Sequence, residues 1–87
     1  MELRWTQDAA RDLERISDYL FENAPKLIRT LYHAPEVLQR FPQRGRPGKK
    51  AGTRELVLWP LPYIVIYRIK GEAVHIVRIL HGAQNWP

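Results

Sequence analysis

The sequence predicts an α+β fold, in which an N-terminal helical hairpin packs on a small antiparallel sheet with a short N-terminal edge strand. Two observations predict this fold. Residues 6–41 carry two successive apolar repeats at helical spacing. Residues 53–87 hold three short runs rich in Val, Ile, Leu, Tyr and Trp, separated by prolines and by a Lys-Gly-Glu sequence, which is typical of strands joined by tight turns.

Length and composition indicate one domain spanning residues 1–87, with a single modest core. The absence of cysteine excludes a disulfide framework, a thiolate metal site and a cysteine nucleophile. The first residues lack an apolar signal core, and no apolar run approaches the ~20 residues of a membrane helix. We therefore expect a cytoplasmic, bacterial-type protein with no membrane partner. Its net charge of +5 favours an anionic partner, either nucleic acid or an acidic protein.

The N-terminal segment predicts an edge strand followed by a first helix. Residues 2–5 alternate as in a short strand, and Thr6 suits a helix N-cap, with Asp8 complementing the helix dipole. The pattern ends near Asn23, before Pro25. Apolar residues recur on one face at Ala9, Leu13, Ile16 and Leu20. Charged residues are expected on the opposite face, at Asp8, Arg11, Asp12, Arg15, Asp18 and Glu22.

A second helix is predicted from Pro25, because proline is tolerated in a first helical turn. Its apolar positions are Leu27, Leu31, Ala34, Leu38 and Phe41. The short link predicts an antiparallel hairpin with both apolar faces turned the same way. Pro35 lies inside this helix, where proline removes a backbone hydrogen bond and costs about 3 kcal/mol. We therefore expect the helix to be bent or split there.

Residues 41–53 predict a loop, because prolines and glycines recur along them. The loop is strongly basic and contains no acidic residue. Such a run is either a solvated loop or a binding surface for phosphates or acidic side chains, and we favour binding because loops beside an active face carry binding groups. Trp86 is either a partner anchor or packs back on the sheet. The predicted nucleic-acid or partner-binding residues are Arg44, Arg46, Lys49, Lys50 and Trp86.

Alternation along the last two strands assigns side chains to faces. If two residues at Gly71 form the turn, Arg68 lies on the side of His75 and His81. Arg78 then lies on the opposite side, with the tyrosines of the preceding strand. A three-residue loop with a bulge at Gly71 would instead bring Arg68 and Arg78 together. Both arrangements fit the sequence.

The sequences GTREL, LPYIVIYR and RILHGAQNWP, behind two amphipathic helices and a GRPG loop, carry a family resemblance. They resemble the RelE/ParE superfamily of toxins from type II toxin–antitoxin systems, over nearly the whole chain. The resemblance implies a helical hairpin packed on an antiparallel sheet. It also implies an antitoxin partner whose acidic or amphipathic tail wraps the toxin. The second helix is about one turn shorter than the family pattern, and its internal Pro35 is a departure.

Two activities occur in that superfamily. ParE-like members bind and poison DNA gyrase, whereas RelE-like members are ribonucleases that cut mRNA on the ribosome. The ribonuclease needs an acid, a base and cations facing the phosphate. RelE-type lysines fall on residues 54–59, which read RELVLW here, and a further RelE-type arginine falls near Ile64, so both are missing. The ParE-like function, gyrase inhibition, is therefore favoured.

The alternative function is a ribosome-dependent endoribonuclease centred on His81, which occupies about the place of a catalytic histidine in YoeB-like and YafQ-like ribonucleases. Arg54, Arg68 or Arg78 would then supply the cation, and histidine can act as acid or base near neutral pH. The structural interpretation is that His81 bonds to backbone, and that Arg68 and Arg78 pair with Glu55 or Glu72 or close the rim of the core.

A third function remains open, a non-toxic module that binds nucleic acid or protein through the basic loop. No cofactor is expected for any of these functions. The sequence has three histidines, and their spacing matches neither HxxxH nor HxH, which argues against a metal site.

Overall fold

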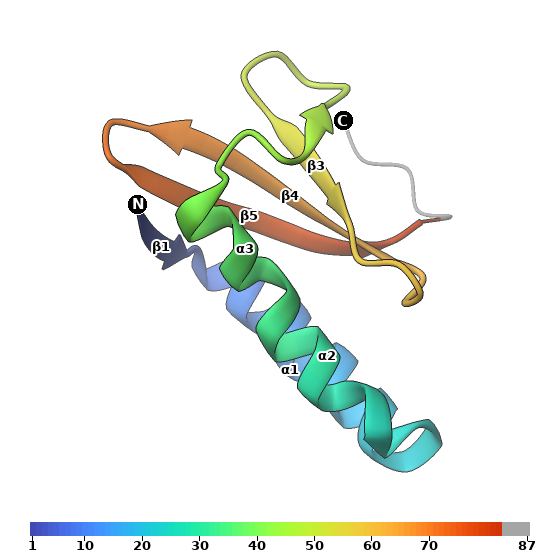
Figure 1. The fold of residues 1–87 in the computed structure, drawn as a ribbon. Coiled ribbons are helices and arrows are strands. Elements are labelled where there is room, and N and C mark those ends of the chain that lie inside the picture. Colours follow the sequence, from blue (N-terminus) through green and yellow to red (C-terminus); the bar gives the residue numbers. More distant parts are fainter. Residues whose placement is uncertain (83–87) are drawn as a thin grey trace.

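The computed structural model describes residues 1–82, so Trp86 lies outside the described residues. Helices pack against one side of a five-stranded sheet whose strand order is β1-β5-β4-β3-β2 (Figure 1). The predicted helical hairpin, sheet and N-terminal edge strand are confirmed. The elements are β1 (Glu2–Trp5), α1 (Gln7–Asn23), α2 (Ile28–His33), α3 (Val37–Arg40), β2 (Arg46–Pro47), β3 (Arg54–Val57), β4 (Tyr63–Lys70) and β5 (Ala73–His81). None of the helices within residues 1–82 has the length and apolar character to cross a bilayer.

Helix α1 is fixed to the sheet at its first residue. The Thr6 hydroxyl accepts a hydrogen bond from the Ala9 amide at 3.1 Å, which is the predicted N-cap. The same hydroxyl donates to the Val77 carbonyl at 2.9 Å, and the Thr6 amide donates to the Ile76 carbonyl at 3.0 Å. The start of the helix is therefore tied to the middle of β5, and the hairpin projects past the sheet at its other end (Figure 1).

The second helix is split, as its internal proline predicts. Pro25–Leu27 forms a 3₁₀ turn, α2 follows, and a second 3₁₀ turn at Ala34–Glu36 separates α2 from α3. Pro35 is buried in this second turn. A 3₁₀ turn accommodates the missing amide hydrogen and the bulk of the proline ring at a smaller cost than a regular helix would.

The pairing of the strands corrects one expectation and resolves an open choice. Lys70 pairs with Ala73, so Gly71 and Glu72 form a two-residue turn, with Gly71 at φ +62°. Strands β2 to β5 pair antiparallel, but β1 pairs parallel with β5, beginning with Glu2 opposite Ala73. The sheet is therefore mixed. The predicted loop at 41–53 contains the short strand β2, which also was not expected.

A β-bulge in β5 was missed by the sequence analysis. Ile66 lies opposite Arg78 while the next residue, Tyr67, lies opposite Ile76, so Val77 is an extra residue in β5. A one-residue insertion exchanges the faces of all later side chains relative to a regular strand. The face assignments that depend on residues after Val77 therefore change.

The bulge corrects the expected grouping of polar residues. Arg68 lies opposite His75, as the two-residue turn predicts. His81, however, lies opposite Tyr63, a residue of the hydrophobic core, and so on the other side of the sheet from Arg68. Arg78 lies opposite Ile66 in the ladder, and its guanidinium binds the buried Asp12 of α1. The predicted grouping of Arg68 with both histidines was wrong for His81.

Tyr67 joins the core to the basic loop. It is fully buried, and its hydroxyl donates to the Pro42 carbonyl at 2.7 Å and accepts from the Gly45 amide at 2.9 Å. A Cβ at Gly45 would lie 2.8 Å from the Tyr67 ring and 2.7 Å from the Glu55 carbonyl. Only glycine fits this contact, which sets where the loop leaves the core.

Candidate functional site

Arg78 lies in a charged cluster between α1 and β5. Its Nε donates to Asp12 Oδ2 at 2.7 Å and its Nη2 to Asp12 Oδ1 at 3.0 Å. The Asp12 carboxylate also accepts from the Ile79 amide at 2.9 Å and from the Arg15 guanidinium. The hydrogen bond with Asp12 raises the pKa of Arg78. This arginine, predicted as a phosphate-facing cation, is engaged by a carboxylate of its own chain.

Asp12 is a residue whose role the sequence analysis missed. It was expected on the charged face of α1, yet it is only 1% exposed. A signal was present in the spacing, because Asp12 follows Ala9 by three residues and precedes Ile16 by four, which places it on the apolar stripe. A buried carboxylate on such a stripe needs a compensating partner. That partner must be a positively charged side chain or a backbone amide that can donate a hydrogen bond.

Arg54 and Arg68 hold the basic loop by its backbone. Arg54 Nη2 donates to the Gln43 carbonyl at 3.0 Å and also to the Gly45 carbonyl. Arg68 Nη1 donates to the Ala51 carbonyl at 3.5 Å. The Arg54 guanidinium therefore contacts the segment between the helices and β2, and the Arg68 guanidinium contacts the turn before β3.

The structure does not bring these arginines to His81. Arg54 lies opposite Tyr67 on β4, and His81 lies opposite Tyr63. Four residues along a strand span roughly 13 Å. Arg68 lies one residue further along β4 and on the other side of the sheet from His81. The four residues predicted as a catalytic set are thus dispersed.

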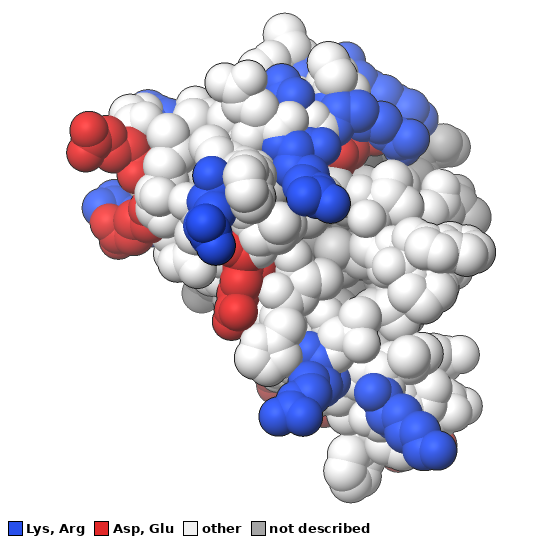
Figure 2. Space-filling view, viewed as in Figure 1, with Lys and Arg blue, Asp and Glu red and all other residues white. Residues whose placement is uncertain are grey.

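His81 instead lies beside two residues of the predicted binding loop. A hollow of about 90 Å³, which we call the basic hollow, opens on the side of the sheet that the helices leave uncovered. Its apolar floor comes from β4 and β5, and its charged rim comes from β2, β3 and the loop. The lining residues are Arg46, Lys49, Glu55, Ile64, Ile66, Leu80, His81 and Gly82. Figure 2 shows Lys and Arg side chains gathered over the loop and the neighbouring strands.

The charges around the basic hollow are only partly compensated. Arg46 forms an ion pair with Glu55 at 3.0 Å, and the Glu55 side chain is 11% exposed. Lys49 is exposed and has no hydrogen-bond or ion-pair partner within residues 1–82. The rim therefore presents a net positive charge over an apolar floor, which suits a partner carrying both carboxylate or phosphate groups and apolar groups.

A second depression meets the basic hollow at His81. It measures about 440 Å³ and lies between α1 and the ends of β4 and β5. The His81 ring stands edge-on to the Tyr63 ring, with centroids 5.8 Å apart and planes at 88°. Burial raises the pKa of Tyr63. The lining residues are Arg15, Ile16, Tyr19, Pro62, Tyr63 and His81.

Arg44 and Lys50, which were also predicted to bind a partner, are not among the residues that line the basic hollow. Arg44 is exposed and borders an open depression formed with Phe41 and Pro42. Lys50 is exposed at the turn before β3, and its carbonyl accepts from the Thr53 hydroxyl. Within residues 1–82 no three His, Asp or Glu side chains are grouped closely enough to hold a metal ion.

A helical hairpin packed on a small sheet is also the fold of several solved toxin structures. The chain is similar to a structure of the chromosomal ParDE toxin–antitoxin system from P. aeruginosa, with 31% identity, a TM-score of 0.75, and 93% of this chain and 95% of the other covered. It is similar to the RelBE2 toxin–antitoxin complex from Mycobacterium tuberculosis, with 29% identity, a TM-score of 0.67, and 92% and 95% covered.

Sequence comparison identifies the family. The chain belongs to the ParE toxins of type II toxin–antitoxin systems (parDE), whose sequence profile matches residues 3–86. It is 38% identical to the putative toxin Y4kP of Sinorhizobium fredii, over 98% of this chain and 92% of the relative. It is 39% identical to toxin RelE2 of Caulobacter vibrioides, over 92% and 93%. The resemblance to RelE/ParE toxins is confirmed, and the likeness to toxin–antitoxin complexes supports a cognate antitoxin as partner.

Proposed function

We propose that this chain arrests growth by binding DNA gyrase unless its cognate antitoxin neutralises it. The family match and the likeness to the ParDE system support a toxin of this type. The observation that favours gyrase binding over RNA cleavage is the engagement of the three arginines. Arg54, Arg68 and Arg78 all bind groups of their own chain.

Cleavage of RNA and inhibition by binding require different arrangements of residues on the surface of the toxin. Cleavage of RNA requires an acid, a base and cations within hydrogen-bonding reach of one phosphate. Arg78 is committed to Asp12, and Arg54 and Arg68 to loop carbonyls. A toxin that acts by binding requires only a complementary surface, and the basic hollow with its apolar floor supplies one.

Expression of the chain in cells without antitoxin tests the target. We expect growth arrest, with reporter plasmid DNA losing negative supercoils on topoisomer gels because gyrase is inhibited. In the same cells, primer extension is expected to find translated messages intact. If plasmid topology is unchanged and the messages are cut at codon-defined positions, the target would be the ribosome and not gyrase. Normal growth at high expression would leave only the non-toxic binding module.

One observation favours the ribonuclease as second candidate. His81 is one of the residues that line the basic hollow with Arg46 and Lys49, although its ring lies against Tyr63 on the other side of the sheet, and these cations are not the ones expected to face the phosphate. Such a set offers proton transfer and charge stabilisation.

Coupled translation with His81→Ala tests this second candidate. Codon-specific cuts made by the wild-type chain that vanish in His81→Ala would establish the ribonuclease. The matched control is His33→Ala, which removes an exposed histidine paired with Glu36 on the helical hairpin. Absence of cuts by the wild-type chain removes the candidate.

A further inference from the structure

An exposed aromatic side chain lies between two arginines where the helical hairpin meets the basic loop. Phe41 directly follows α3 and is 52% exposed. The guanidinium carbon of Arg40 lies 5.7 Å from the centroid of the Phe41 ring, which is a cation–π contact. These two residues line an open depression of about 500 Å³ together with Pro42, Gln43 and Arg44. We call it the aromatic depression.

The backbone of this segment is held in place by side chains of the sheet. The Tyr67 hydroxyl donates to the Pro42 carbonyl, and Arg54 donates to the Gln43 carbonyl. The side chains of Gln43 and Arg44, in contrast, are exposed and form no hydrogen bond or ion pair within residues 1–82. A surface whose backbone is already fixed loses little conformational entropy when it binds another molecule. The aromatic depression is therefore preorganised for a ligand.

The positive charge around the aromatic depression is not compensated by the chain. Residues 37–54 contain no acidic side chain. The acids that flank this run, Glu36 and Glu55, are each bonded to another side chain. Arg40 and Arg44 form no ion pair in the part of the chain that the structure describes. Such charge attracts the phosphate or carboxylate groups of another molecule.

The exposed ring favours a nucleic acid over an acidic peptide. Every nucleobase has a flat face that stacks on an aromatic ring or on an arginine guanidinium, and each nucleotide carries one phosphate. Arg40 and Phe41 offer both stacking surfaces side by side, and Arg44 adds a cation. The Gln43 amide can donate to and accept from the edge of a base. A duplex hides the faces of its bases in the stack, so this arrangement suits unpaired nucleotides.

We propose that the aromatic depression binds unpaired nucleotides of a single-stranded nucleic acid, with a base stacked on Phe41 and phosphates at Arg40 and Arg44. This binding activity goes beyond the proposed inhibition of gyrase. The aromatic depression shares no lining residue with the basic hollow. None of its lining residues is a histidine or an acid that could transfer a proton at neutral pH, so it holds a strand without cutting it.

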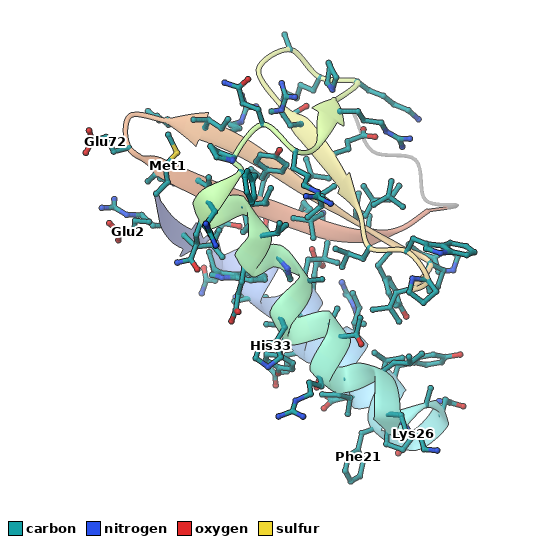
Figure 3. The ribbon with its side chains drawn as sticks, in the orientation of Figure 1. Met1, Glu2, Phe21, Lys26, His33 and Glu72 are labelled. Carbon is teal, nitrogen blue, oxygen red and sulfur yellow. The ribbon has the colours of Figure 1, made fainter. Side chains whose placement is uncertain are left out.

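Fluorescence anisotropy with a labelled oligodeoxythymidylate and the full chain tests the stacking. We expect Phe41→Leu, which keeps an apolar side chain but removes the ring, to weaken binding about fivefold or more. Phe41→Tyr keeps the ring and should bind within about twofold of the wild type. The matched control is Phe21→Leu, at a ring that is 72% exposed at the far end of the hairpin in Figure 3, and it should change affinity less than about twofold.

The salt dependence of the same binding tests the phosphate contact. Arg44→Ala is expected to weaken binding and to reduce the slope of log K against log salt by about 0.7, the contribution of one phosphate contact on a single strand. Arg29→Ala removes an exposed arginine from α2 and should leave the slope and the affinity as in the wild type. An unchanged slope in Arg44→Ala would contradict the phosphate contact.

The choice of ligand separates the possible occupants. Wild-type affinity in Phe41→Leu, or a duplex bound as tightly as the single strand, would overturn the proposal. Polyglutamate bound as tightly as the oligonucleotide would assign the aromatic depression to an acidic protein instead. Oligouridylate distinguishes the two sources of the strand, since tighter binding of either oligonucleotide identifies RNA or DNA and supports the site. Gyrase takes no part in these assays, so failure of gyrase inhibition leaves their outcome unaffected.

Discussion

The charged cluster around Arg78 in β5 and the rim of the basic hollow both contain basic residues, but they differ in what compensates the positive charge. Arg78 is held by Asp12, a carboxylate that is 1% exposed and also accepts the Ile79 amide. Lys49, at the rim of the basic hollow, has no such partner within residues 1–82. The first group fixes a helix to a strand, and the second is available to another molecule. The number of basic residues in a sequence therefore does not measure its binding surface.

The largest effect on stability is expected in the buried cluster of Asp12 and Arg78. Asp12→Ala should lower the free energy of unfolding by about 3 kcal/mol or more, because it leaves Arg78 and the Ile79 amide without their acceptor. Urea unfolding measures the change. Asp18→Ala removes an exposed acid from the same helix and should cost less than about 0.5 kcal/mol. Equal midpoints for the two variants would show that the cluster does not stabilise the fold.

A smaller loss is expected where the basic loop leaves the core. Gly45→Ala should destabilise the chain by about 1–3 kcal/mol, because the new Cβ meets the Tyr67 ring at 2.8 Å. Gly82→Ala is the matched substitution, since its Cβ would have its nearest neighbour at 3.7 Å. Thermal unfolding followed by circular dichroism should separate the two variants. A Gly45→Ala chain as stable as Gly82→Ala would mean that the loop shifts without cost.

On the exposed side, function should change while stability does not. Lys49→Ala is expected to alter the free energy of unfolding by less than about 0.5 kcal/mol, yet to reduce toxicity because it removes the uncompensated charge of the hollow. Colony counts after induced expression measure the toxicity. Lys26→Ala, on a lysine at the end of the hairpin in Figure 3, should stay as toxic as the wild type. Equal toxicity of both variants would remove Lys49 from the functional surface.

The smallest effect is expected for the exposed ion pair between Glu2 and Arg4 on β1. The Arg4 guanidinium lowers the pKa of Glu2 by hydrogen bonding and by charge. A lowered pKa in the folded state contributes stability above the pKa of the unfolded state, and this contribution is lost as the pH falls through the folded pKa. Arg4→Gln should raise the pKa of Glu2 in an NMR titration, with hardly any change in unfolding at neutral pH because the pair is fully exposed. An unchanged pKa would show that the pair is absent in solution.

Local patterns in the sequence were sufficient for much of the fold. The N-cap at Thr6, the split at Pro35 and the turn at Gly71 all follow from residues close together in the chain. The parallel pairing of β1 with β5 and the bulge at Val77 were not predicted. Both depend on contacts between residues far apart in sequence, and the Thr6 hydrogen bonds to Ile76 and Val77 are an example.

The candidate site was predicted only in part, because its residues come from segments that are far apart in the sequence. The basic loop and His81 were both singled out, and Arg46, Lys49 and His81 are all among the residues that line the basic hollow. The arginines were assigned by residue type alone, which does not show that Asp12 is buried or that loop carbonyls accept from Arg54. Trp86 stays a prediction, because it lies outside the described residues.

Supercoiling of relaxed plasmid by purified gyrase, with the chain added over a range of concentrations, tests the proposed target most directly. We expect the wild-type chain to inhibit the reaction, Lys49→Ala to require a higher concentration, Lys26→Ala to match the wild type, and the antitoxin to restore supercoiling. Full gyrase activity at saturating concentrations of a chain that still arrests growth would contradict the assignment and transfer it to the ribosome.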